Sequence, residues 1–360
     1  MAKARVIAFY LPQFHPIPEN DEWWGKGFTE WTNVGKAKPL FPGHKQPKVP
    51  SDLGYYDLRL PEIYDEQTRL AKEAGIEGFC FWHYYFGDGK QLLEKPLQRI
   101  VNESKNDFPF CLGWANESWY AKVWSNDKTK DKLLIEQKYN GIEDYEKHFY
   151  LMLNTFLDKR YIKVDGKLLF LIYRPDEFKD VKVFMDLWQE LAKKEGLNGF
   201  HFVASSKRNI PNPQRYLALG YDAVYTDRMW KGFELRKSII KSTLYLICKL
   251  FRYPRIESYK AVVNAGYSED DKNEYFYPGI LCGWDHTPRS KKNGMCVIGF
   301  SQKLFGQHIR KILTLVKDKL PEHKVIFLKS WNEWGEGNYM EPDFEYGNMK
   351  LETLKAELID

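Results

Sequence analysis

The sequence has few cysteines, and none of them forms a pairing motif. Its 360 residues contain five, an odd number, with no CxxC spacing. Disulfide frameworks and cysteine-ligated zinc sites both require recognisable spacings. Most of the five lie in or beside apolar runs, so we expect reduced thiols packed in the core of a cytosolic protein. They are Cys80, Cys111, Cys248, Cys282 and Cys296.

The sequence also lacks targeting and membrane-spanning segments. Its first residues run directly into the apolar segment Val6–Tyr10, with no signal-peptide pattern before it. No apolar stretch approaches the roughly 20 residues of a membrane span. The net charge of +5 is mild, and no dense Lys/Arg run predicts nucleic-acid binding. We therefore expect a cytoplasmic protein.

Motifs for bound cofactors are absent as well. Gly87–Lys90 lacks the spacing of a phosphate-binding loop, and no GxGxxG follows an apolar run. The histidines are scattered without an HExxH pair, and no Asp-x-Asp triplet occurs. The sequence thus predicts neither a metal nor a dinucleotide cofactor. The missing triplet disfavours a metal-dependent nucleotide-sugar transferase, although metal-independent transferases exist.

Aromatic residues, by contrast, are abundant. They make up 16% of the chain, with 12 Trp and 23 Tyr. Aromatic rings stack on the apolar faces of sugar rings, and Tyr and Trp add a hydrogen-bonding group. The composition fits either a carbohydrate site or a tryptophan-rich core, and the count alone does not separate the two.

Eight short apolar runs alternate for the most part with segments of helical period. Continuous apolar character suits parallel strands buried on both faces. Strand–helix alternation repeated eight times predicts an α/β fold, a single (β/α)8 TIM barrel over residues 1–360, because no linker or repeat divides the chain. The predicted strands are Arg5–Tyr10, Gly78–Trp82, Phe110–Trp114, Leu168–Tyr173, Phe200–Ser205, Ala223–Thr226, Gly279–Cys282 and Lys324–Lys329.

Five of the connecting segments have a clear helical period. The predicted helices are Pro61–Ala74, Leu92–Ser104, Ile142–Leu157, Val181–Glu195 and Gln302–Lys319. Lys207–Gly220 has little periodicity and connects the fifth and sixth units, which are the weakest of the eight. The longest connection runs from Leu11 to about Leu60 and is rich in Pro, Gly and Trp, and we expect it to be ordered and functional.

The predicted strand ends carry aromatic, amide and charged residues. In such barrels the catalytic groups lie at the C-terminal ends of the strands. A rim of this kind suits a polyhydroxylated ligand, with rings stacking on its faces and polar groups bonding its hydroxyls. We expect Trp82, Trp114, Trp284 and Trp331 to approach the mouth of one cleft. The candidate binding residues are Tyr10, His15, Trp82, His83, Trp114, Asn116, Glu117, Arg174, Tyr225, Asp227, Trp284, Asp285, His286, Trp331 and Asn332, and Arg289 follows the seventh strand.

The last predicted strand runs into Trp331-Asn332-Glu333-Trp334-Gly335-Glu336-Gly337. Glycoside cleavage requires one carboxyl group as acid and a second as base or nucleophile. Crowding two carboxyl groups separates their pKa values, so one can hold a proton at neutral pH. Glu333 and Glu336 are therefore the candidate catalytic residues; the alternative is a pair of solvated loop glutamates. Glu341 is a further carboxyl group nearby.

Several of these motifs together resemble the WbsX-type family of bacterial polysaccharide-biosynthesis proteins. They are Phe9-Tyr10-Leu11-Pro12-Gln13-Phe14-His15-Pro16-Ile17-Pro18-Glu19-Asn20, Trp23-Trp24-Gly25-Lys26-Gly27-Phe28-Thr29-Glu30-Trp31, Trp114-Ala115-Asn116-Glu117, Tyr173-Arg174-Pro175 and the Trp331–Gly337 segment. That family is similar in turn to glycoside hydrolase family 99, the endo-acting α-mannosidases and mannanases. The Trp-rich segment Glu22–Trp31 is a WbsX feature with no counterpart that we can map onto the hydrolases.

The resemblance implies a (β/α)8 barrel, no metal cofactor and a retaining, substrate-assisted mechanism through an anhydro-sugar. Carried over, Glu333 is the base on the neighbouring 2-hydroxyl, and Glu336 is the acid for the leaving group and then the base for water. Tyr10 and Tyr225 match substrate-contacting tyrosines. WbsX-type proteins are described as presumed glycosyltransferases of O-antigen or capsule pathways.

Three functions follow as hypotheses. The first is a glycosidase or transglycosylase acting on bacterial surface glycans or their lipid-linked precursors. The second is a glycosyltransferase that builds such a glycan, and the third is a non-catalytic sugar-binding barrel, which the glutamate pair disfavours. Leu235–Arg255 mixes aliphatic and cationic residues at roughly helical spacing. It predicts either a packed outer helix with a basic face or peripheral contact with an anionic membrane.

Overall fold

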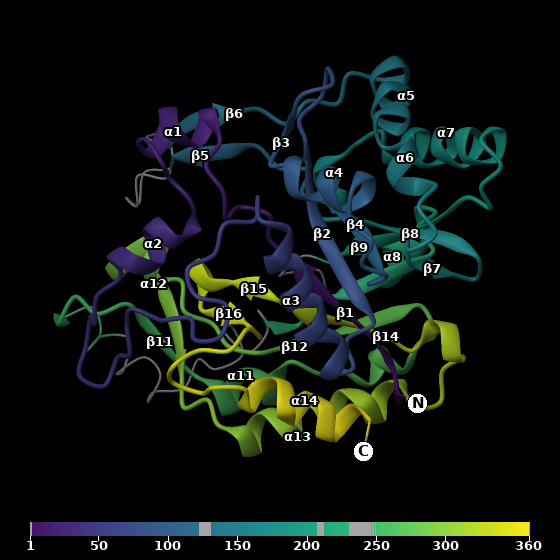
Figure 1. The fold of residues 1–360 in the computed structure, drawn as a ribbon. Coiled ribbons are helices and arrows are strands. Elements are labelled where there is room, and N and C mark those ends of the chain that lie inside the picture. The colour runs from purple at the N-terminus through teal and green to yellow at the C-terminus, as the bar shows by residue number, and fades with distance from the viewer. Residues whose placement is uncertain are drawn as a thin grey trace.

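Eight parallel strands form the centre of the molecule in the computed structural model, which describes residues 2–121, 131–206, 212–229, 246, 248 and 250–359. The strands are β1 (Arg5–Tyr10), β2 (Gly78–Tyr85), β4 (Phe110–Trp114), β8 (Lys167–Ile172), β9 (Phe200–Ser205), β10 (Ala223–Thr226), β12 (Phe276–Leu281) and β14 (Val325–Lys329). Because β1 pairs in parallel with both β2 and β14, the sheet closes into a barrel (Figure 1). The predicted fold and all eight predicted strands are confirmed.

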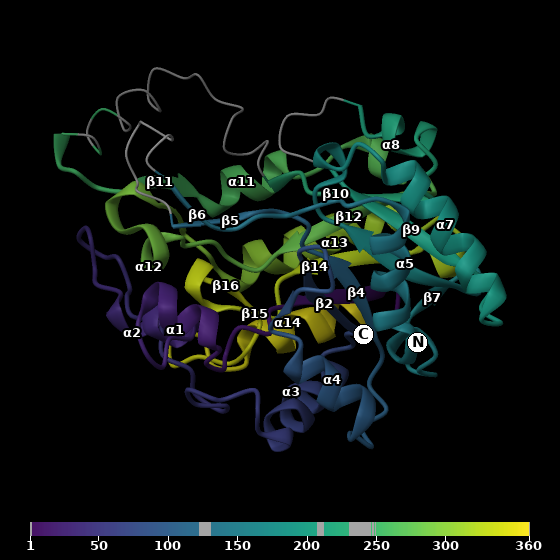
Figure 2. The same ribbon diagram turned by 90° about the horizontal axis from the view of Figure 1, so that it is seen from above.

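Helices cover the outside of the barrel (Figure 2). They are α3 (Pro61–Glu73), α4 (Lys95–Asn102), α5 (Ile142–Leu151), α6 (Leu153–Phe156), α7 (Val181–Lys194), α8 (Gln214–Ala218), α11 (Tyr259–Ala265), α13 (Gln302–Val316) and α14 (Met349–Leu358). Pro61 fits the first turn of α3, where its missing N–H has no helical partner to lose. The Ser301 hydroxyl accepts a hydrogen bond from the backbone N–H of Leu304 at the start of α13. The apolar faces of these helices pack on the strands. The two termini lie on the same side of the molecule, where Lys3 N donates to Leu358 O at 2.9 Å.

Two predicted helices differ from the observed ones. The segment predicted as helix from Leu92 starts helical geometry only at Lys95, because Gln91–Leu92 forms β3 and pairs with the end of β2. The segment predicted from Ile142 is interrupted at Met152, which separates α5 from α6. In both cases the spacing of apolar residues identified the buried face of the helix correctly. The late start of α4 and the break between α5 and α6 depend instead on pairing and packing with other elements.

The long connection after β1 is ordered, as expected. It contains α1 (Pro18–Trp24) and α2 (Glu30–Lys36), which lie at the left of Figure 1, opposite the two termini. A capping box at Thr29 starts α2. The two ends of the connection are held together by hydrogen bonds from Trp31 Nε1 to Tyr56 O at 2.7 Å and from Leu58 N to Phe14 O at 3.1 Å.

Shorter elements follow the other strands. These are β5 (Trp119–Ala121), β6 (Lys132–Ile135), β7 (Lys163–Val164), η2 (Pro175–Glu177), β11 (Arg255–Ser258), η3 (Glu269–Lys272), α12 (Thr287–Ser290), η4 (Lys291–Asn293), β13 (Met295–Ile298), η5 (Pro321–His323), β15 (Asn332–Glu333), η6 (Trp334–Glu336) and β16 (Asn338–Tyr339). All five cysteines are buried and unbridged, as predicted. Within the described ranges, no helix is both long enough and apolar enough to cross a bilayer.

Candidate active site

A cavity of about 2040 Å³ opens at the C-terminal ends of the barrel strands. Its floor is an aromatic layer inside the barrel. The rings of Phe9 and Trp82 stack at 4.7 Å, Phe9 and Phe327 stack at 5.1 Å, and Tyr225 meets Phe9 edge-on at 5.3 Å. Helix α2, the β5–β6 hairpin and α12 contribute to its walls. The cavity is therefore wide, aromatic at its base and polar above, as a polyhydroxylated ligand requires.

The loop after β14 brings the two glutamates into this cavity. Asn332 fixes the loop to the end of β1, because its Oδ1 accepts from Leu11 N at 2.8 Å and its Nδ2 donates to Leu11 O at 3.0 Å. Gly337 closes the turn at φ +58°, and a Cβ there would lie 2.9 Å from the backbone nitrogen of Asp285. Glu333 and Glu336 both line the cavity, with side chains 12% and 19% exposed.

Arg289 on α12 lies between the two glutamates. Its Nη1 donates to Glu336 Oε1 at 2.7 Å and its Nη2 to Glu333 Oε2 at 3.1 Å, so the two carboxyl groups share one guanidinium. Burial raises the pKa of Glu333 to about 8; Arg289 opposes this shift, whereas Glu336 and Glu30 add to it. Glu333 thus holds its proton at neutral pH, which suits an acid, whereas the family resemblance assigns it the part of the base.

A third carboxyl group reaches the same arginine. Glu30, the first residue of α2, accepts from Arg289 Nε at 3.0 Å, and its side chain is only 4% exposed. The candidate list drawn from the sequence omitted Glu30. Its only signal was its place in the Trp-rich segment Trp23–Trp31, which the resemblance to WbsX-type proteins had already marked.

Nine of the predicted site residues meet in the cavity. Tyr225 and Trp82 belong to its aromatic floor, and Asp227 accepts from Lys329 Nζ at 2.7 Å. The nine are Trp82, Glu117, Arg174, Tyr225, Asp227, Trp284, His286, Glu333 and Glu336.

The other eight predicted residues lie behind the cavity wall, at or beside strand ends. They are Tyr10, His15, His83, Trp114, Asn116, Asp285, Trp331 and Asn332. Successive residues of a strand point to opposite faces, so Phe9 faces the barrel interior while the Tyr10 hydroxyl donates to Gln67 of α3 at 2.7 Å. Of the four tryptophans expected at the mouth, Trp82 and Trp284 line the cavity, and Trp114 and Trp331 do not.

Several of these buried residues support the site from behind. The Asn116 side chain accepts from Arg174 N at 2.8 Å and donates to Arg174 O at 3.1 Å, which places Arg174 against Glu117. Glu341 accepts from Gln67, Tyr56 and Trp334 beneath the loop that follows β14, and burial raises its pKa to about 7. Burial lowers the pKa of His15 to about 4 and that of His83 to about 3, so both imidazoles are neutral parts of the packing.

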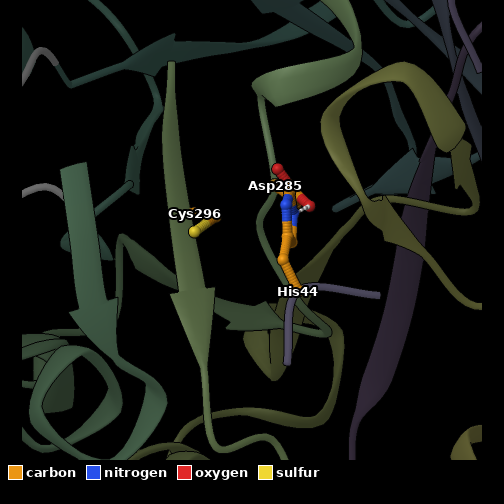
Figure 3. Close-up of side chains that lie close together, drawn as sticks. All are labelled: His44, Asp285 and Cys296. Atoms are coloured by element: carbon orange, nitrogen blue, oxygen red, sulfur yellow. Dashed lines mark hydrogen bonds and ion pairs between the residues drawn. The ribbon is translucent and has the colours of Figure 1, made fainter. Parts of the chain in front are cut away.

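His44, Asp285 and Cys296 lie close together at the edge of the site (Figure 3), each with one possible metal-ligand atom within 4.8 Å of the others. Both oxygens of Asp285 already accept hydrogen bonds, Oδ2 from His44 Nε2 at 2.8 Å and Gln46 Nε2 at 2.6 Å, and Oδ1 from Thr287. Although burial opposes it, the bonds from His44, Thr287 and Gln46 hold the pKa of Asp285 below its usual range, whereas burial raises that of the Cys296 thiol. The cluster is accounted for as an anchor that joins the first long loop to the loop after β12.

Comparison with solved structures gives the same fold. A protein described as a glycoside hydrolase-like protein has a TM-score of 0.63 and 17% identity, with 98% of this chain and 93% of the other covered. A glycoside hydrolase family 99 endo-α-mannosidase from Bacteroides thetaiotaomicron has a TM-score of 0.54 and 15% identity, covering 97% and 95%. At these identities the likeness is one of fold.

Comparison by sequence gives the family. Two curated proteins called WxcX, from strains B100 and ATCC 33913 of Xanthomonas campestris pv. campestris, are 33% identical over 372 residues that cover 99% of this chain. This chain spans about half the length of these relatives, 50% of each. Residues 6–354 match the family described as glycosyltransferase WbsX. The chain thus belongs to the WbsX family, on a barrel shared with family 99 glycoside hydrolases.

Proposed function

We propose that this protein is a retaining glycoside hydrolase or transglycosylase that acts on bacterial surface glycans. The observation that carries the proposal is the pair Glu333 and Glu336, which face a large aromatic-floored cavity and share Arg289. Fold-level likeness to endo-α-mannosidases supports the reaction class by analogy.

The proposed reaction passes through an anhydro-sugar. Glu333 takes the proton of the sugar 2-hydroxyl, and that oxygen attacks C1 as the bond from C1 to the leaving oxygen breaks. Glu336 protonates the leaving oxygen. Glu336 then accepts a proton from water or an acceptor hydroxyl, whose oxygen attacks C1; the bond between O2 and C1 breaks, and Glu333 returns its proton to O2. A pKa of about 8 leaves Glu333 mostly protonated at neutral pH, so the base of this step is its ionised fraction, which grows as the pH rises toward 8.

Matched substrates test the two roles separately. Glu336→Gln should lower turnover of an oligosaccharide by roughly 10²–10⁴-fold, with a much smaller defect on an aryl glycoside whose leaving group needs no proton. Glu333→Gln should be equally impaired on both, because its step forms the internal nucleophile. Aryl α-mannosides and mannose oligosaccharides, with 2-deoxy analogues, are the first probes.

The outcomes are decisive. If both variants keep wild-type rates on every substrate that the wild type cleaves, the glutamate pair is not the catalytic site. If a 2-deoxy substrate turns over normally, the pair acts without substrate assistance, as a direct nucleophile pair or by inversion.

The second candidate is a glycosyltransferase of O-antigen or capsular polysaccharide biosynthesis. The family description favours it, whereas the missing Asp-x-Asp triplet disfavours a metal-dependent transferase. Turnover of nucleotide sugars, measured beside the cleavage screen, separates the two. Consumption of a nucleotide sugar with an oligosaccharide acceptor, without hydrolysis of any glycan, selects the transferase.

A cytoplasmic enzyme acting on lipid-linked glycans would work at the inner face of the membrane, and we include peripheral contact through Leu235–Arg255 in the proposal. Most of that segment lies outside the described residues; of the remainder, Leu246, Leu250 and Phe251 are exposed apolar side chains. Replacing Lys241, Lys249 and Arg252 by Glu should abolish binding to anionic vesicles and leave cleavage of soluble substrates unchanged. Vesicle binding that survives this change, or that the wild type does not show, contradicts membrane contact.

A further inference from the structure

Arg289 contacts three carboxyl groups at once, two of which are the proposed catalytic pair. Its distances are 2.7 Å to Glu336, 3.1 Å to Glu333 and 2.9 Å to Glu30. One cation cannot neutralise three carboxylates, so the cluster carries excess negative charge when all are ionised. Buried groups of this kind cost desolvation energy that their attraction repays only partly. The arrangement is therefore poorly explained as a device for stability.

Glu30 is positioned before any ligand binds. It begins α2 behind the capping box at Thr29, and its backbone N–H donates to Gln13 O at 3.1 Å. Asn33 Nδ2 donates to its Oε1 at 3.3 Å, which leaves Oε2 for Arg289. The carboxylate is thus held from its own helix and directed at the guanidinium.

The catalytic loop is shaped to admit this carboxylate. Gly335 separates the two catalytic glutamates in sequence, and a Cβ built on it would lie 2.0 Å from Glu30 Oε2 and 3.0 Å from Arg289 Nε. Any side chain at this position would occupy the space of the Glu30 carboxylate. The loop and α2 are therefore complementary at the contact between Glu30 and Arg289.

We propose that Glu30 is a positioning residue for the catalytic glutamates, which acts through Arg289 to fix the guanidinium between Glu333 and Glu336. The proposal rests on the proposed function of that pair. It also gives the WbsX-type Trp-rich segment a role in the site, since the segment ends at the start of α2.

Glu30 and Arg289 together should also set the protonation of Glu333. The charged and titratable groups that act on this carboxyl are Arg289 of α12, Glu336 of η6, Glu30 of α2 and Lys329 of β14. Burial, and after it Glu333, raises the pKa of Tyr84 of β2. Removing the charge of Glu30 removes a repulsion from Glu333 and leaves Arg289 with two carboxyl partners. Both effects lower the pKa of Glu333.

The test compares Glu30→Gln with Asp158→Asn. Asp158 is also a buried carboxylate paired with an arginine, Arg160, with side chains 10% and 8% exposed, but it does not line the cavity. Three quantities are measured: the titration midpoint of Glu333 by carbon-13 NMR of its carboxyl carbon, assigned with Glu333→Gln; kcat and KM on an aryl α-mannoside or the best oligosaccharide; and the melting temperature.

We expect Glu30→Gln to lower the Glu333 midpoint by about one pH unit and kcat by roughly 10- to 100-fold, with little change in KM. Asp158→Asn should lower the melting temperature and leave midpoint and kcat at wild-type values. An unchanged midpoint in Glu30→Gln overturns the proposal, even where kcat falls in step with the melting temperature. The titration of Glu333 needs no substrate, so it tests the role of Glu30 even if the proposed function is wrong. The proposed function fails separately, if Glu333→Gln and Glu336→Gln retain full turnover.

Discussion

Glu333 is a carboxyl group whose ionisation opposes folding. Its pKa lies at about 8 in the folded protein against an ordinary value of 4.5, chiefly because it is buried. Between these two values the unfolded chain releases the proton while the folded chain keeps it, so folding stability falls as pH rises, by about 1.4 kcal/mol per pH unit for one proton. Burial of Glu341, with its pKa of about 7, acts in the same direction.

Glu333→Gln should therefore be more stable than the wild type at alkaline pH. Below pH 4.5 the wild-type group is protonated in both states and the advantage disappears, and it should grow through the interval up to about pH 8. Melting temperatures of both proteins across this interval measure it. Glu103→Gln, at an exposed position, is the control and should show a constant difference. A constant difference for Glu333→Gln as well would contradict the raised pKa.

At the scale of elements, the proposed positioning of Glu333 and Glu336 depends on the contact between η6 and α2. Gly335→Ala keeps every charge of the site but puts a methyl group 2.0 Å from Glu30 Oε2. The carboxylate must then move away from Arg289. We expect a loss of turnover comparable to that of Glu30→Gln and a modest loss of stability.

Gly35→Ala is the matched control for that substitution. Gly35 lies within α2 itself, and a Cβ there meets nothing within 4 Å. Alanine in a helix is favoured over glycine by roughly 0.5–1 kcal/mol, so this variant should melt at a slightly higher temperature with normal turnover. Equal activities of the two variants would show that the approach of α2 to the catalytic loop does not matter.

At the scale of the whole molecule, the cavity is far larger than one sugar ring. Its volume of about 2040 Å³ compares with roughly 300–1,000 Å³ for the pockets of drug-sized ligands. The β5–β6 hairpin and α2 extend the walls beyond the glutamate pair, and Trp119 contributes a half-buried indole there. An enzyme with this cavity should prefer a substrate several sugars long.

Trp119→Ala tests this extension. Losing an aromatic stacking partner should weaken binding by about 1 kcal/mol, or roughly fivefold in KM, for oligosaccharides long enough to reach the hairpin. The shortest substrate cleaved should keep its KM, since the glutamates and the aromatic floor are untouched. The kinetic constants across a series of chain lengths check this; an equal effect at every length would place Trp119 beside the scissile bond.

The sequence by itself determined the eight strands and the alternation that makes a barrel. A strand buried on both faces is apolar at every position, as in Phe110–Trp114, so it can be recognised from consecutive residues of the sequence. The placement of Glu333 and Glu336 just past the last strand is local in the same way, and both residues line the cavity at the C-terminal ends of the strands.

Only the tertiary structure decided which strand-end residues face the ligand. In a strand buried on both faces, Phe9 and Tyr10 are equally apolar neighbours, and closure of the barrel turns one inward and the other toward α3. The link between Glu30 and Arg289 spans 259 positions. The spacing of residues along the sequence cannot predict this contact. It forms only because the first long loop folds back over the loops that follow the last strands.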